Sequence, residues 1–203
     1  MKPEICPGRY GDSIFWRGIE RMKIVLLLEE SSMKELLDII LPRIIPEDVS
    51  FLTIPHEGKS DLQKSIPNKL RGWNEPDVKF VIVHDQDSND CLELKNELRN
   101  LCNSAGKEAL IRISCHELES WYFGDLQAVS KAFNIDLTKY AKKSKFRVPD
   151  SIENPKSELK KMLPNYGQRE GARKIAKYMD ISSNTSHSFN VFVSGIKALC
   201  EVR

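Results

Sequence analysis

The sequence lacks the long apolar run that a membrane span needs. A transmembrane helix takes about 18 or more consecutive apolar residues, whereas the longest run here is the five-residue stretch Ile24–Leu28. No signal-peptide core of continuous apolar residues precedes that stretch. We therefore expect no membrane contact and a cytoplasmic location.

Cysteine is also scarce and shows no pairing pattern. The five cysteines are odd in number and form no C-x-x-C spacing, which argues against a disulfide framework and against a zinc knuckle. Reduced thiols, as in cytosolic proteins, are expected. Residues 1–21 have scattered prolines and glycines and no hydrophobic period, so we expect a disordered or non-native extension, with Met22 as the natural start.

From Lys23 onward, short apolar runs alternate with segments of helical period, which predicts an α/β fold with a central, mostly parallel four-stranded sheet flanked by helices. The predicted strands are 24–28, 49–54, 80–84 and 109–115. The predicted helices between them are 31–45, 61–73 (interrupted near Pro67) and 90–104.

After Glu117 the pattern is helical, apart from a basic loop at 139–148. The helices expected there are 117–133, 155–163, 170–179 and 187–201, with 189–193 as the one further candidate strand. We expect residues 22–125 to form an α/β core and residues 126–203 to form a helical region packed on it.

The strand 80–84 leads into the pair Asp85 and Asp87. Two carboxylates at the end of a central strand suit Mg²⁺ or Mn²⁺, which prefer oxygen ligands. A turn that caps the next helix through Ser88, Asn89 or Asp90 explains the same residues equally well.

Two other strands also end in acids. If the strand 24–28 lies beside 80–84, Glu29 can face Asp85 and Asp87, and there bind a metal or move a proton; alternatively, Glu29 only complements the dipole of the next helix. After the fourth strand, Glu117 and Glu119 fall on different faces of a helix, and we select Glu119 as the site residue.

The residues around these acids have structural explanations as well. For His84 and His116, hydrogen bonding or packing is the favoured role over metal binding or proton transfer. Trp121, Tyr122 and Phe123 are expected in the core.

Charge is distributed unevenly. Residues 137–180 carry twelve Lys and Arg against five Asp and Glu, whereas the rest of the chain carries nineteen against twenty-four. An acidic site beside a basic segment suits a metal-dependent enzyme that acts on a polyanion, although a basic helix face is as often simply solvated. The candidate phosphate contacts are Lys59, Lys142, Lys143, Lys145 and Lys156.

Five motifs in order resemble a family of small, stand-alone, TOPRIM-like bacterial proteins, related in fold to topoisomerase and primase TOPRIM domains and to overcoming-lysogenization-defect (OLD) nucleases. The motifs are Leu28-Glu-Glu-Ser-Ser-Met-Lys-Glu35, His84-Asp-Gln-Asp-Ser-Asn-Asp-Cys91, Glu117-Leu-Glu-Ser-Trp-Tyr-Phe-Gly-Asp125, Asn154-Pro-Lys156 and Ser188-Phe189.

This resemblance, over about residues 22–200, implies a nuclease that binds Mg²⁺ through Asp85 and Asp87, with Glu29 as general acid or base and Glu119 as a further ligand. It also implies DNA or RNA as substrate and an ATPase partner in bacterial defence against phage. One departure is Glu30, where many TOPRIM domains have glycine.

Two other functions remain for comparison. The fold could serve as a non-catalytic regulatory or partner-binding subunit of an ATPase complex. A haloacid-dehalogenase-like phosphatase also uses Asp-x-Asp after a strand, but it places that pair on its first strand and has Thr or Val where this chain has Asn89.

Overall fold

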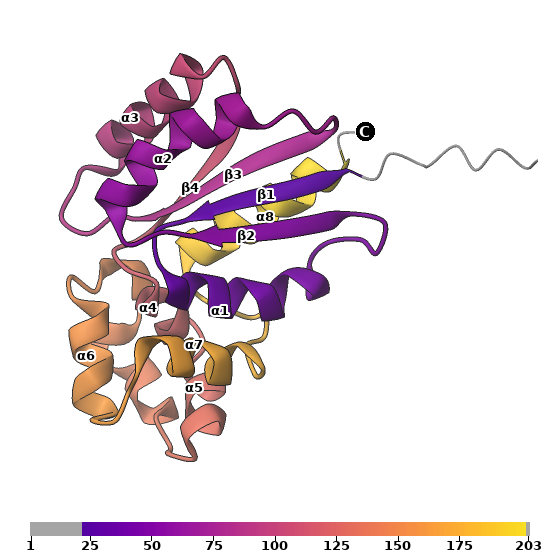
Figure 1. The fold of residues 1–203 in the computed structure, drawn as a ribbon. Coiled ribbons are helices and arrows are strands. Elements are labelled where there is room, and N and C mark those ends of the chain that lie inside the picture. The colour runs from indigo at the N-terminus through magenta and orange to yellow at the C-terminus, as the bar shows by residue number, and fades with distance from the viewer. Residues whose placement is uncertain (1–21, 202–203) are drawn as a thin grey trace, which may run out of the picture.

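The computed structural model describes residues 22–201, and at its centre lies a four-stranded sheet (Figure 1). The strands are β1 (Lys23–Leu28), β2 (Ser50–Pro55), β3 (Val78–Asp85) and β4 (Ala109–Ser114). All neighbouring strands run parallel, in the order β2-β1-β3-β4. The predicted α/β fold with a parallel sheet is confirmed. The extension predicted for residues 1–21 lies outside the described residues.

Helices cover both faces of the sheet. They are α1 (Ser31–Ile40), α2 (Lys59–Gly72), α3 (Cys91–Ser104) and α8 (His187–Glu201). Because successive strand residues point to opposite faces, Val25 and Leu27 join the core beneath α2 and α3, whereas Leu26 and Leu28 join the core beneath α1 and α8. Figure 1 shows the two helix pairs on opposite sides of the sheet.

The inner strands β1 and β3 bring their carboxyl ends to the same edge of the sheet. Leu28, the last residue of β1, lies opposite Val83 of β3. The residue that follows Leu28 therefore lies beside the last two residues of β3. In open parallel sheets, ligands bind outside this edge.

The chain beyond β4 is helical, as predicted, but with different breaks. Its shorter helices are α4 (Glu119–Phe123), α5 (Leu126–Phe133), α6 (Pro155–Met162) and α7 (Gln168–Ala176). The single helix predicted over 117–133 is wrong, because it is split after Phe123 and the Asp125 side chain caps α5 by accepting from the N–H of Ala128 at 2.9 Å. Residues 189–193, the further candidate strand, lie within α8.

Pro67 does not interrupt its helix, contrary to the prediction. A proline inside a helix lacks the N–H that would bond the carbonyl four residues earlier, yet α2 continues from Lys59 to Gly72. Its buried stripe of Leu62, Ile66 and Leu70 packs in the core against the sheet, and this burial outweighs the lost hydrogen bond. Among residues 22–201, no helix has the length and apolar character needed to cross a membrane.

Candidate functional site

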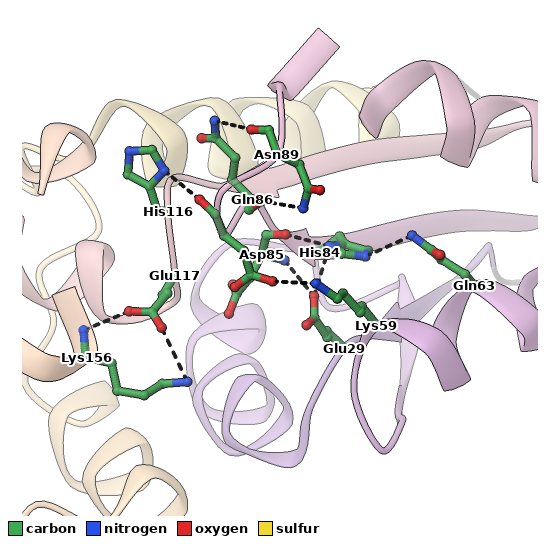
Figure 2. Close-up of polar contacts among 11 residues, drawn as sticks. Glu29, Lys59, Gln63, His84, Asp85, Gln86, Asn89, His116, Glu117 and Lys156 are labelled. Atoms are coloured by element: carbon green, nitrogen blue, oxygen red, sulfur yellow. Dashed lines mark hydrogen bonds and ion pairs between the residues drawn. The ribbon is translucent and has the colours of Figure 1, made fainter. Parts of the chain in front are cut away.

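Glu29 and Asp85 meet at the carboxyl edge of the sheet. Glu29 directly follows β1, and its Oε2 accepts a hydrogen bond from the backbone N–H of Asp85 at 2.9 Å. The structure therefore places Glu29 across from Asp85, as the sequence predicted (Figure 2). The pairing follows from the strand order, because β1 and β3 are neighbours in the sheet.

The carboxylate of Glu29 also contacts a buried histidine. Nδ1 of His84 lies 2.9 Å from Oε2 of Glu29, and the imidazole is fully buried. Burial acts to raise the pKa of Glu29, but the hydrogen bond and charge of His84 and the hydrogen bond from Asp85 outweigh it, so the pKa lies below its ordinary value. Glu29 is thus ionised at neutral pH.

Asp85 has the opposite electrostatic character. Its side chain is almost fully buried, and its Oδ1 forms no hydrogen bond within the described part of the chain. Burial, followed by the charges of Glu29 and Glu119, holds the pKa of Asp85 well above its ordinary range. A buried carboxyl group without a donor costs free energy unless a cation or proton compensates it.

Asp87 reaches the same edge through a turn, since β3 ends at Asp85. Asp87 has a left-handed backbone (φ 52°). Its N–H donates to the carbonyl of His116 and its own carbonyl lies 2.9 Å from Nδ1 of His116, so this turn is tied to the segment after β4. The helix-capping turn, which the sequence offered as the other explanation of this stretch, is formed by Asp90. Its side chain accepts hydrogen bonds from the N–H groups of Leu92 and Glu93 and caps α3.

Glu117 and Glu119 have different surroundings, because helix α4 begins only at Glu119. Glu119 is fully buried; its Oε1 accepts from the hydroxyl of Tyr166 at 3.0 Å, while its Oε2 has no hydrogen bond to any described residue. Burial raises the pKa of Glu119 to about 7, against the opposing charge of Lys156. Glu117 lies in the preceding loop and contacts Lys156, whose N–H and Nζ lie 2.9 and 3.6 Å from its two oxygens (Figure 2).

The candidate lysines fall into two groups. Lys59 and Lys156 are at the site: Nζ of Lys59 lies 3.4 Å from Oδ2 of Asp87, and Lys156 contacts Glu117. The other three lie in short 3-10 helices at 138–142 and 144–146 and in the turn between them. There Lys145 pairs with Glu158, and Lys143 lies over the ring of Tyr140. Within residues 22–201, the ion pairs of the site carboxylates involve Lys59 and Lys156 and none of these three lysines.

The four predicted metal ligands are not gathered into one shell. Within residues 22–201, no three His, Cys, Asp or Glu side chains lie close enough together to hold an ion. The donor set nevertheless fits a divalent cation, because Asp85 Oδ1 and Glu119 Oε2 are buried carboxylate oxygens without a donor. Oxygen ligands of this kind suit Mg²⁺ or Mn²⁺.

Several residues around the site were not predicted as part of it. Ser88, His116 and Glu153 help line a cavity of about 450 Å³ beside Asp87 and Glu117. Tyr166 from the α6–α7 connection reaches Glu119, and Gln168, the first residue of α7, reaches Glu30. No local pattern identifies such residues, because only the tertiary fold brings them near. A larger hollow of about 640 Å³ lies at the amino ends of β3 and β4, away from these acids.

The family of the chain can be read from a comparison with family models. Residues 28–197 match the model described as "Domain of unknown function (DUF4276)". The chain belongs to the DUF4276 family. This match spans the five motifs up to Ser188-Phe189 and confirms the family resemblance drawn from them. No curated protein matches the sequence.

Two solved structures are similar to this DUF4276 chain. One is the C-terminal region of the OLD protein of Burkholderia pseudomallei, with 16% identity and a TM-score of 0.49, covering 87% of this chain and 96% of that one. The other is the C-terminal region of the OLD protein of Xanthomonas campestris pv. campestris, with 14% identity and a TM-score of 0.47, covering 89% and 96%.

Proposed function

We propose that this DUF4276 protein is a Mg²⁺-dependent nuclease of TOPRIM type, which hydrolyses phosphodiester bonds in DNA or RNA. The observation that carries the proposal is the pairing of Glu29 with Asp85 at the carboxyl edge of the two inner strands. Glu29 is ionised at neutral pH, whereas Asp85 is a buried carboxyl group whose charge requires compensation by a cation or a proton. Such divergent environments are typical of acids with separate chemical roles.

In this proposal each residue has a distinct task. Asp85, Asp87 and Glu119, which do not form a closed ligand shell as their side chains stand, would converge on Mg²⁺ or Mn²⁺. Glu29 would take a proton from the attacking water or complete the ligand set. The bound ion would polarise the phosphate and orient water. Lys59 and Lys156, which already face the acids, would contact the negatively charged phosphate of the substrate.

Divalent cations are expected to stabilise the folded protein. A ligand that binds only the native state adds about 2.7 kcal/mol at a hundredfold excess over its Kd. Thermal unfolding should therefore shift upward as Mn²⁺ or Mg²⁺ is raised, and the double variant Asp85→Asn, Asp87→Asn should show no shift. Asp90→Asn is the matched control, because Asn caps a helix as well as Asp does. An equal shift in the double variant would refute ion binding at these aspartates.

We further propose that Lys142, Lys143 and Lys145 contact the nucleic-acid backbone outside the cleavage site. Each phosphate contact contributes about 0.9 to the slope of log affinity against log salt concentration. Lys142→Ala with Lys143→Ala should lower that slope by about 2 and weaken binding of all sequences alike. Lys79→Ala, an exposed site at the amino end of β3, is the control. An unchanged slope in the double variant would remove these lysines from the interface.

The function is tested by incubating purified protein with DNA or RNA, with Mg²⁺, with Mn²⁺ and with a chelator. Cleavage that requires the ion supports the nuclease. The alternative is a non-catalytic subunit that binds an ATPase partner in anti-phage defence. In a complex reconstituted with that partner, cleavage and protection that survive loss of Glu29 and Asp85, but not loss of the partner contact, would favour the alternative.

A further inference from the structure

The side chain of His84 shares a face of the sheet with Glu29. It follows Phe80 and Ile82 in the alternation of β3, on the side covered by α2 and α3. Its Nε2 lies 3.5 Å from the side-chain amide nitrogen of Gln63 in α2. The imidazole is fully buried. It is therefore enclosed between the sheet and α2, with its Nδ1 directed toward the acidic edge (Figure 2).

The contacts of Nδ1 identify which ring nitrogen carries the hydrogen. Nδ1 lies 2.6 Å from the carbonyl oxygen of Asp85 and 2.9 Å from Oε2 of Glu29. A carbonyl oxygen only accepts hydrogen bonds, so Nδ1 must be the donor. His84 therefore carries a hydrogen on Nδ1 and directs it at two oxygen acceptors.

The two oxygens of Glu29 are consequently not equivalent. Oε2 receives donors from His84 and from the backbone N–H of Asp85. For Oε1, the described residues provide no hydrogen-bond donor, and the Glu29 side chain is 12% exposed. A carboxylate held at one oxygen by two donors has a fixed plane and rotamer, so its other oxygen points in one direction.

We propose that His84 is a positioning residue, which holds Oε2 of Glu29 and thereby leaves Oε1 as the oxygen that acts in the site. This inference rests on the proposed nuclease function for its chemistry, but the hydrogen-bond arrangement can be tested without it. A histidine that only fills space in the core would serve equally well with its hydrogen on either nitrogen. A positioning histidine must present Nδ1–H.

Two variants of similar polarity separate these roles. The amide nitrogen of Asn can lie where Nδ1 lies, whereas that of Gln reaches only as far as Nε2. Loss of a residue that orients a ligand or base costs about 10- to 100-fold in activity or metal affinity. His84→Gln should therefore lower kcat at least about tenfold with little change in KM, while His84→Asn should stay within about threefold of the unchanged protein. Equal losses in both variants would overturn the proposal.

The tautomer gives a readout that does not depend on cleavage. Long-range ¹H–¹⁵N spectra of the histidine side chains should show the His84 hydrogen on Nδ1, with a resonance that moves when Glu29→Gln weakens the acceptor. A hydrogen found on Nε2 alone, or a resonance unaffected by Glu29→Gln, would overturn the proposal. If the protein cleaves no nucleic acid under any condition, the nuclease function fails, and the spectra still decide the role of His84.

Discussion

Asp85→Asn and Glu29→Gln should each lower the rate of metal-dependent cleavage at least about a hundredfold, the loss typical of an essential acid or base. Each substitution keeps the size of the side chain and removes its negative charge. Asn at position 85 would offer one neutral oxygen where the proposed cation requires a carboxylate. Gln at position 29 could still accept the hydrogen bond from Asp85 but could not take a proton.

The measurement is single-turnover cleavage with saturating Mg²⁺ or Mn²⁺, with folding checked by circular dichroism. Asp90→Asn provides a control from the same acidic stretch, since Asp90 caps α3 and has no role in the proposed chemistry. It should cleave at the rate of the unchanged protein. Rates within about threefold of that protein for both Asp85→Asn and Glu29→Gln would exclude these acids from the reaction.

Glu119→Gln should make the metal-free protein more stable at alkaline pH. Burial raises the pKa of Glu119 from its ordinary 4.5 to about 7 in the folded state. Between those values the folded chain binds more protons than the unfolded chain, so the free energy of unfolding falls as pH rises. Above pH 7 this effect lowers the free energy of unfolding by roughly 3 kcal/mol in full, because each unit of pKa shift corresponds to about 1.4 kcal/mol.

Gln carries no charge, so the free energy of unfolding of the variant does not fall in this way. The amide oxygen of Gln can still accept a hydrogen bond from Tyr166. Denaturant unfolding in a chelator should give a stability difference between variant and unchanged protein that grows from pH 4.5 to pH 7 and then stays constant. Asp85 adds a pH dependence of the same sign to both proteins. Because the charge of Glu119 contributes to the raised pKa of Asp85, the difference between the two proteins reports Glu119 together with its interaction with Asp85. Glu97→Gln, on the exposed face of α3, is the control. A stability difference independent of pH would contradict a buried, protonated Glu119.

The sequence predicted the acidic edge because the necessary signals are local. A run of apolar residues that ends in an acid identifies a strand end, and placing β1 beside β3 brings Glu29 to Asp85. The choice of Glu119 over Glu117 rested on a helix assumed to begin near 117. In the structure α4 begins at Glu119, and burial separates the two glutamates more than helix phase does.

What local patterns could not predict depends on contacts between distant segments. Tyr166 lies in the short α6–α7 connection and Gln168 begins α7, and neither belongs to a motif. Yet Tyr166 bonds the buried Glu119, and Gln168 bonds the half-buried Glu30. The candidate strand at 189–193 was wrong for a related reason. Phe189, Phe192 and Val193 have the apolar character of a strand, but they form the buried face of α8, which covers the sheet.

The alternation of side chains across the sheet also limits how a ligand can approach. Glu29 lies on the α2 side of the sheet, with His84 and Gln63. The pKa of Asp85, in contrast, is affected by the charges of Glu119 and Lys156, which lie on the α4 and α6 side. A ligand that contacts both acids must therefore straddle the rim of the sheet. Lys59 stands on one side of that rim and Lys156 on the other, so a polyanion crossing it would meet positive charge before and after the acids.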